Sequence, residues 1–507
     1  MSAVNQWPNP IVAGFYPDPS VVKVGEDYYL ACSTFEYLPG IPVFHSRDLT
    51  SWTQVGNVVE REGQLASATV PTLGGAWAPT IRHRDDLFYV VVTDAMGRGM
   101  LIFTAADAAG PWSDGTLVDG IHGIDSDLAW DDDGTAYITY SGLDTTSGQA
   151  PGPHKGILQI TVDLATGTPL SEPVSLWSGT GLKFPEAPHL YQHDGFWYLM
   201  IAEGGTERGH GISVARGLSP SGPFESGAAV GGPPNPILSA RSTNRTVQNT
   251  GHGDLVETPD GGWAIVMLGM RPAGLTQSFS ALGRETYITS ARWENGWLAA
   301  DPVIVNPRPG DTTVREGFDP GAPLPAQWMG VRRYPEQVAS LTERGGWLTI
   351  HGEGATLDAQ QPAFVGWRQQ HPLAEVSVLV DPGTGTGGMG VRYDEEHHYE
   401  IEVGHGRVTA RACLAGIRQE WTRDVPDAPV VLGLDFVAPT GDSILTGLTS
   451  DVVVLSVGAG EDLVELARVD GRYLTQETAA SFTGRVIGLY AVEGHVAFDD
   501  FAYTGRG

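Results

Sequence analysis

Apolar and aromatic runs recur at a regular interval along the first part of the chain. Five times, a polar or aromatic residue in a short segment marked by Pro or Gly precedes a strand-like apolar run by about ten residues. Each leading residue and the start of its run are Asp18 and Tyr28, Trp77 and Phe88, Asp125 and Ala136, Glu186 and Phe196, and His252 and Trp263. The interval of about 50 to 65 residues is close to one four-stranded propeller blade. We therefore predict a five-bladed β-propeller.

The five leading residues occupy equivalent positions in this repeat. In a propeller the innermost strand of each blade lines a central channel. If each leading residue begins such a strand, three carboxylates, a tryptophan and a histidine point toward one axis. None of the units contains a convincing amphipathic helix, which agrees with an all-β fold class.

The pattern changes after about Pro307, where a turn-rich segment leads into runs that alternate apolar and polar residues. Such runs start at Trp347, Glu375, Tyr399 and Val452. A period of two, interrupted by Gly and Asp turns, is typical of an antiparallel sandwich with one face of each sheet solvated. We predict two domains, a five-bladed β-propeller over residues 1–306 and a β-sandwich over residues 307–507.

Composition supports strands and excludes several kinds of partner. The 507 residues include 67 Gly, 35 Pro and 14 Trp but only 18% charged residues, which suits short strands and tight turns. The formal charge of -30 argues against nucleic acid or an anionic membrane surface as a partner, because both are bound by clustered Lys and Arg. A neutral sugar is compatible with this charge, since hydrogen bonds and aromatic stacking carry its recognition.

The N-terminus and the cysteines bear on the compartment. The segment MSAVNQWPNP has neither the basic nor the apolar region of a signal peptide, and no stretch reaches about 18 apolar residues. We therefore predict a soluble, cytoplasmic protein. Cys32 and Cys413 lie far apart and outside any metal or redox spacing, so we expect free thiols.

The three carboxylates of the repeat are candidates for catalysis. Asp18 lies between two prolines in GFYPDPS, Asp125 lies in GIDSDLAW, and Glu186 lies in LKFPEAPHLY before an apolar strand. Asp18 and Glu186 also have a structural interpretation, because Asp beside Pro commonly forms a turn and a Glu can cap one. Asp127 could share the face of Asp125 and is a weaker candidate, whereas the acidic run 131–133 is interpreted as a solvated hairpin turn.

Together the three carboxylates fit glycoside hydrolysis with inversion. That reaction needs a protonated acid on the leaving oxygen and an ionised base that activates water on the opposite face, with the two carboxyls roughly 6.5 to 9.5 Å apart. Facing blades of a narrow channel could supply this gap. A third carboxylate beside the acid would raise the pKa of the acid by repulsion and help to orient it, a role that suits Asp125.

The ordered motifs of the chain resemble glycoside hydrolase family 43, specifically its two-domain β-xylosidase and α-L-arabinofuranosidase branch. The resemblance runs through NPIVAGFYPDPS, STFEYLPGIPVFHSRDLTSW, GGAWAPTIRH, IDSDLAWDDDG, PEAPHLY, AEGGT, GHGDLV and LGRET. It continues through SLTERGGWLTIHG, VGWRQQH and FTG, and so covers nearly the whole chain. It implies a five-bladed propeller followed by a β-sandwich.

By position, the resemblance implies that Asp18 is the general base, Asp125 the carboxylate that modulates pKa and orientation, and Glu186 the general acid. It further implies a pocket for one terminal sugar, closed by the sandwich domain. The residues implied to line or close this pocket are Phe35, Trp77, Arg284 and Phe482.

The chain departs from the family pattern at two places. Ser126 and Asp127 follow Asp125 where the family commonly has Pro and Ser, and Ala187 follows the acid where Gly is common. These departures leave the triad intact but leave the choice between xylose and arabinofuranose open.

One metal interpretation is kept and two other motifs are set aside. His252 fits either a structural histidine or, as the resemblance implies, a neighbour of a water-coordinated calcium or other ion in the channel. The glycines at 383, 385 and 388 fit GxGxxG, but a strand-like run follows them, which argues against dinucleotide binding. His397 and His398 are interpreted as solvated residues at a strand edge.

The favoured function is an inverting, exo-acting glycoside hydrolase that releases terminal xylose or arabinofuranose from xylo-oligosaccharides or arabinoxylan fragments. A β-xylosidase is preferred over an α-L-arabinofuranosidase. Less favoured are a non-catalytic sugar-binding propeller and a retaining enzyme that acts on fructosides, whose Arg-Asp-Pro motif is missing. We expect a small oligosaccharide as substrate and no required cofactor, and the sequence leaves the oligomeric state open.

Overall fold

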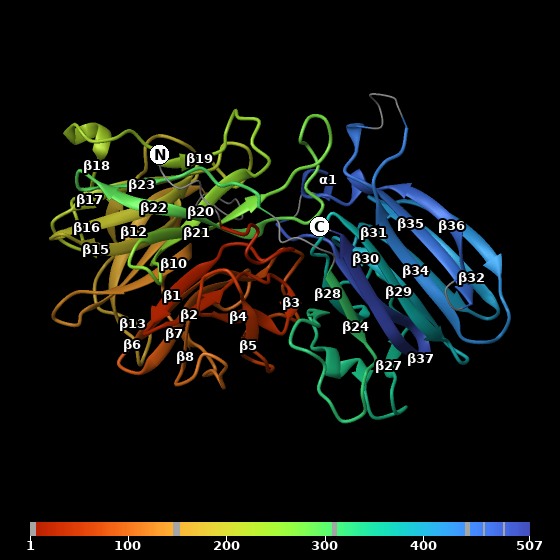
Figure 1. Ribbon diagram of the computed structural model, residues 1–507. Helices are drawn as coiled ribbons and strands as arrows, with labels where there is room; N and C mark the ends of the chain where they lie inside the picture. The colour runs from red at the N-terminus through yellow and green to blue at the C-terminus, as the bar shows by residue number, and fades with distance from the viewer. Residues whose placement is uncertain are drawn as a thin grey trace.

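The computed structural model describes residues 7–144, 153–306, 312–441, 447–459, 462–479 and 482–506. Strands dominate this part of the chain, which confirms the all-β prediction. Its α-helix, α1 (Gln476–Ala479), is a single turn, and no helix of the described residues is long and apolar enough to cross a membrane. Figure 1 shows two bodies side by side, a propeller and a sheet-rich second domain.

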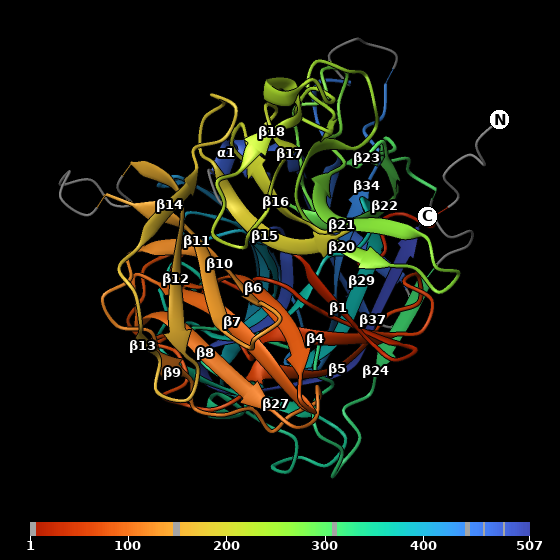
Figure 2. The same cartoon turned by 90° about the vertical axis from the view of Figure 1, so that its left-hand side faces the viewer.

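Five antiparallel sheets form the blades of the propeller, which Figure 2 shows arranged around one axis. The first blade consists of β1 (Ser20–Val24), β2 (Asp27–Ala31), β4 (Gly40–Ser46) and β5 (Thr53–Val59). The second consists of β6 (Gly75–Arg84), β7 (Leu87–Ala95), β8 (Gly99–Ala105) and β9 (Thr116–Leu117). The third is β10 (Gly123–Trp130), β11 (Ala136–Leu143), β12 (His154–Asp163), with β13 (Thr168–Pro169) and β14 (Val174–Trp177) both paired to β12.

The last two blades complete the ring. The fourth blade consists of β15 (Glu186–His193), β16 (Phe196–Glu203), β17 (Gly211–Gly217), β18 (Glu225–Ser226) and β19 (Leu238–Ser239). The fifth consists of β20 (Gln248–Glu257), β21 (Trp263–Met270), β22 (Glu285–Glu294) and β23 (Trp297–Ala300). Each apolar run of the sequence repeat is the second strand of a blade: β2, β7, β11, β16 and β21. The five-bladed prediction is confirmed.

The innermost strands close around the axis. β1 lies beside β6 and β20, β10 lies beside β6 and β15, and β15 lies beside β20. The segment before the first blade is held against the last blade, because the Asn9 amide donates to the Ile288 carbonyl (2.8 Å) and Val12 forms a bridge with Thr286. The chain thus fastens its first segment to its fifth blade.

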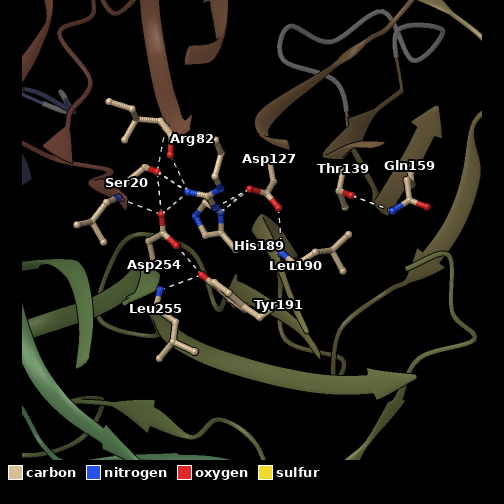
Figure 3. Close-up of polar contacts among 12 residues, drawn as sticks. Ser20, Arg82, Asp127, Thr139, Gln159, His189, Leu190, Tyr191, Asp254 and Leu255 are labelled. Atoms are coloured by element: carbon tan, nitrogen blue, oxygen red, sulfur yellow. Dashed lines mark hydrogen bonds and ion pairs between the residues drawn. The ribbon is translucent and has the colours of Figure 1, made fainter. Parts of the chain in front are cut away.

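A buried ion network lies among these innermost strands (Figure 3). Arg82 on β6 donates to Asp127 on β10 (2.6 Å) and to Asp254 on β20 (2.8 Å). Ser20 on β1 and Tyr191 on β15 donate to the two oxygens of Asp254 (2.7 and 2.6 Å). Burial opposes ionisation of both carboxyls, but the Arg82 guanidinium and the hydrogen bonds to each carboxylate together outweigh it. The pKa of Asp127 and that of Asp254 therefore lie below the ordinary value. One network therefore joins all five blades.

The second domain is a β-sandwich, as predicted, and one long strand belongs to both of its layers. β37 (Val486–Arg506) pairs with β28 (Ala363–Arg368) and β30 (Thr386–Arg392) through its first half. Its middle pairs with β27 (Leu348–Glu353), and its second half pairs with β24 (Thr312–Glu316) and β29 (Leu373–Asp381). One layer continues from β30 through β31 (His397–Gly404), β32 (Arg407–Leu414) and β33 (Ile417–Asp424). The other continues from β29 through β34 (Val430–Val437), β35 (Val452–Ala459) and β36 (Asp462–Asp470).

The two layers enclose an apolar core made by alternate residues of their strands. On β31, Tyr399, Ile401 and Val403 enter this core, so His398 and Glu400 lie on the opposite face of the sheet. His398 is nevertheless fully buried, so its interpretation as a solvated residue is wrong. The glycines at 383, 385 and 388 precede or lie in strand β30, as the sequence indicates.

Propeller and sandwich share an apolar interface. β25 (Gly330–Val331) pairs with β3 (Tyr37–Leu38), and Arg332 donates to the Val70 carbonyl (2.8 Å). One buried cluster takes residues from both domains: Phe15, Phe35, Tyr37, Met329, Val331, Leu357, Phe364, Val486 and Tyr490, with Trp77 and Phe482 packed against it. The boundary predicted between residues 306 and 307 adjoins residues 307–311, which lie outside the described part, and it stays a prediction.

We predict that Arg82→Leu lowers the free energy of unfolding by about 3 to 5 kcal/mol, because two buried carboxylates lose their cation. Urea denaturation measures this, with Lys23→Ala as the matched control, since Lys23 pairs with Glu257 at the surface. An Arg82→Leu protein as stable as the control would mean that the network does not hold the blades together.

Candidate active site

The five leading residues lie at one end of the innermost strands, and the backbone there is unusual. A residue with φ between 43° and 55° occurs at each position: Asp18, Ala78 after the tryptophan, Asp125, Ala187 after the glutamate, and His252. The pairing of β6, β10, β15 and β20 with their neighbours is also interrupted at this end. Bulges and left-handed residues re-aim side chains and are frequent at functional sites. Here they point the side chains into one cavity.

Asp18 is buried and held by two donors. Ser33 donates to Oδ2 (2.6 Å) and Arg284 donates to Oδ1 (2.9 Å), while His252 Nδ1 lies 3.5 Å from Oδ1. Burial would raise the pKa of Asp18, but the charge of Arg284 and the hydrogen bond from Ser33 outweigh it, so the pKa lies below the ordinary value. Asp18 is therefore ionised at neutral pH.

Asp125 and Glu186 have the opposite electrostatics. Burial and the negative charge of Asp18 raise the pKa of Asp125 to about 7. Burial, followed by the charges of Asp125 and Asp18, raises the pKa of Glu186 well above its ordinary value. The Ala187 amide, next to Glu186, donates to Asp125 Oδ2 (3.2 Å), which ties the two strands together. Glu186 therefore keeps its proton to a higher pH than an ordinary glutamate does.

An aromatic wall and one arginine adjoin the carboxylates. Phe482 of the second domain lies 6.3 Å from Phe35 and 5.9 Å from Trp77, measured between ring centroids. Arg284 donates to Asp18 and also to the carbonyl of Phe482 (3.1 Å), and its guanidinium lies over the Phe482 ring (5.2 Å). Arg284 thus connects the ionised carboxylate to the second domain.

A cavity of about 420 Å³ collects these side chains. The predicted residues that line it are Asp18, Phe35, Trp77, Asp125, Glu186, His252, Arg284 and Phe482. Asp127, the weaker candidate, is not among the lining residues and pairs instead with Arg82 in the axial network. The structure brings all eight predicted site residues together.

His252 is a poor centre for a calcium ion. Calcium takes oxygen ligands, and the nearby Asp18 oxygens are already bonded to Ser33 and Arg284. Burial lowers the pKa of His252 to about 3, so the ring is neutral and offers at most one nitrogen donor. Among the described residues, the His/Cys/Asp/Glu clusters spaced to hold a metal lie in the second domain and do not include His252. The donors do not fit a directly bound ion here, and the predicted water-coordinated ion beside His252 stays a prediction.

The sequence interpretation missed several residues of the cavity. Met96 and Phe184 line it and are 55% and 42% exposed, which places them at its rim. His154 lies against the Phe184 ring, with ring centroids 5.2 Å apart. Phe184 stands two residues before Glu186 in KFPEAP, so its closeness to the acid was a usable signal. Met96 follows β7 in a turn and His154 is the first residue of β12, and neither belongs to a motif.

Comparison with known proteins gives two family matches. Residues 7–298 match the family described as glycosyl hydrolases family 43. Residues 315–504 match the β-xylosidase C-terminal concanavalin A-like domain. The two matches fall on the propeller and on the sandwich.

Whole-length relatives agree. The chain is 32% identical to a xylosidase/arabinosidase of Butyrivibrio fibrisolvens, over 97% of each chain. It is 32% identical to a non-reducing end α-L-arabinofuranosidase of Bacteroides ovatus, over 95% of this chain and 90% of the relative. Among solved structures, a xylan β-1,4-xylosidase from Bacillus halodurans is 29% identical with a TM-score of 0.86, covering 98% of this chain and 99% of the other.

Proposed function

The chain belongs to glycosyl hydrolase family 43, and we propose that it is an inverting, exo-acting enzyme that releases a terminal xylose or arabinofuranose from small xylo-oligosaccharides or arabinoxylan fragments. The observation that carries the proposal is the opposed ionisation of two carboxyls in one cavity. Asp18 has a lowered pKa and Glu186 a raised one, which matches a base and an acid that work in the same step.

In the proposed reaction Asp18 accepts a proton from a water molecule while the oxygen of that water attacks the anomeric carbon. The glycosidic C–O bond breaks, and Glu186 gives its proton to the leaving oxygen. The sugar leaves with inverted configuration, and the proton on Asp18 returns to Glu186 through solvent. Asp125 acts through Glu186: its negative charge keeps the acid protonated, and its bond to the Ala187 amide holds the acid's strand in place.

The shape of the cavity supports action on a chain end. Phe35, Trp77 and Phe482 form an apolar wall around the carboxylates, and Arg284 supplies hydrogen-bond donors beside Asp18. A closed wall limits the enclosed part of the substrate to one sugar and excludes bulk water, which strengthens the electrostatics. The exposed Phe184 and Met96 at the rim would then face the leaving group.

Both β-xylosidase and α-L-arabinofuranosidase activity fit this site, and we favour the first. The relatives carry both names: one is a xylosidase/arabinosidase, one a non-reducing end α-L-arabinofuranosidase and one a xylan β-1,4-xylosidase. Initial rates on nitrophenyl β-D-xyloside and nitrophenyl α-L-arabinofuranoside decide between the two. NMR of the first-formed sugar tests inversion, and absence of turnover on both substrates and on xylobiose would leave only a sugar-binding role.

No step of the proposed reaction requires a cofactor or a metal ion. The proposed partner is the oligosaccharide alone. This distinguishes the site from metal-assisted hydrolysis, in which added chelator removes activity.

We predict that Glu186→Gln reduces kcat/KM for xylobiose by about 100- to 10,000-fold. The loss should be much smaller on a nitrophenyl glycoside, whose leaving group needs little protonation. Asp18→Asn should instead lose activity to a similar degree on both, since water must be activated in either case. Asp132→Asn, at an exposed turn, is the matched control. Equal losses on the two substrates for Glu186→Gln would contradict its assignment as acid.

We predict that Asp125→Asn shifts the basic limb of the kcat/KM profile to lower pH. The Asp125 carboxyl, whose pKa is about 7, becomes negative as the pH rises and so retains the proton on Glu186. Without that charge Glu186 ionises earlier and the acid form is lost sooner. A basic limb that coincides with that of the unaltered enzyme would mean that Asp125 is not coupled to the acid.

We predict that Phe482→Ala raises KM for xylobiose by about tenfold, which is about 1.4 kcal/mol of binding free energy. The physical reason is the loss of an apolar wall against the bound sugar. Tyr473→Ala removes an exposed aromatic of the same domain and is the matched control. Unchanged steady-state kinetics for Phe482→Ala would mean that the second domain does not contribute to substrate binding.

A further inference from the structure

A second cluster of reactive side chains lies in the sandwich domain, outside the carboxylate cavity. His398 on β31 and Cys413 on β32 are directly opposite each other in the sheet, and both are buried. The Asp358 carboxylate comes from the connection between β27 and β28, and its Oδ1 lies 3.4 Å from His398 Nε2. One ligand atom from each of the three residues lies within 4.8 Å of the others.

The spacing suits a tetrahedral metal ion. With metal–nitrogen and metal–oxygen bonds of about 2.0 to 2.1 Å, two ligands of a tetrahedral zinc ion lie about 3.4 Å apart. The observed separation of His398 Nε2 and Asp358 Oδ1 has this value. Imidazole, thiolate and carboxylate together form a ligand set that zinc accepts and calcium does not.

The far side of the histidine is also arranged as in metal sites. His398 Nδ1 lies 3.3 Å from Glu400 Oε2, and apart from this ion pair neither atom has a hydrogen-bond partner within the described residues. A histidine that binds a metal through one nitrogen commonly presents the other to a carboxylate, which fixes the ring and raises its basicity. Glu400 is itself oriented by Arg411, which lies 3.2 Å from its Oε1.

The cluster opens onto a cavity of about 590 Å³ between the domains. Asp358 and Cys413 line it together with Asp394, Glu395 and Glu396, so its surroundings are acidic and favour cations. We propose that Asp358, His398 and Cys413 form a binding site for a divalent ion of the zinc class, with a fourth coordination position open to this cavity. Glu400 is the carboxylate that positions His398.

Arg418 pairs with one of the proposed ligands and would compete with a bound metal ion for it. Its Nη2 lies 2.5 Å from Asp358 Oδ1, so a metal would displace it. The Arg418 side chain is 50% exposed and can turn into solvent. This competition gives the proposal a directional test, because removal of the guanidinium should tighten metal binding.

A surface cluster provides the internal control. Glu343, His351 and His495 also have metal-like spacing, but they lie at the surface and contain no sulfur. The other free thiol, Cys32, is buried in the propeller. A thiolate–metal signal therefore reports on Cys413 alone, and His351→Asn removes the rival cluster from the titration.

The experiment titrates the full-length His351→Asn protein, freed of metal by chelator, with Co²⁺ and follows its absorption spectrum. One equivalent of Co²⁺ should give a thiolate-to-cobalt charge-transfer band and the intense visible bands of tetrahedral cobalt, and Zn²⁺ should abolish both. Cys413→Ser should remove the charge-transfer band and weaken binding by about 100-fold, whereas Cys32→Ser should change nothing. Glu400→Gln should weaken binding by about 10- to 100-fold, and Arg418→Gln should strengthen it.

Two outcomes would overturn the proposal. One is the absence of a charge-transfer band at one equivalent of Co²⁺ in a protein that still hydrolyses its glycoside. The other is a band that survives Cys413→Ser. Glycosidase activity serves as the check that each variant is folded, because none of these residues lines the carboxylate cavity.

Discussion

The propeller depends on one guanidinium that is shared by two buried carboxylates at its axis. Arg82 draws Asp127 and Asp254 together from different blades, and Ser20 and Tyr191 complete the set, so each innermost strand contributes to one network. Taking these charges out of water costs free energy, which good geometry and many hydrogen bonds offset. The network also fixes the position of each innermost strand along the axis, because its polar side chains meet in one register only.

That register also sets the chemistry. Ser20 stands two residues after Asp18, Asp127 two after Asp125, and Asp254 two after His252. The network and the cavity thus use successive inward positions of the same strands, and a strand that slipped would move both at once. The opposed pKa values of Asp18 and Glu186 follow from this fixed arrangement, since Arg284 stands beside the first and carboxylates stand beside the second.

Much of this structure could be predicted from the sequence because the signals repeat. Five apolar runs at similar spacing identify the blades, and Asp18, Asp125 and Glu186 stand at the same place in their units. Arg82 could not be identified in this way, since the basic run of Arg82, His83 and Arg84 has the pattern of a solvated strand end. The burial of His398 was missed for a related reason: its face of β31 is polar, and only the tertiary fold covers it. The pattern along a strand shows which residues share a face, but it does not show which other segments of the chain cover that face.

The shared membership of β37 in both layers has a consequence for biosynthesis. A ribosome delivers the chain from its N-terminus, and domains fold as they emerge. The propeller can assemble early, but the sandwich lacks the strand that joins its layers until residues 486–506 have been made. Phe482 stands four residues before that strand, so the wall of the cavity is completed in the same late event. A chain interrupted before this point would carry all three carboxylates in an unfinished pocket.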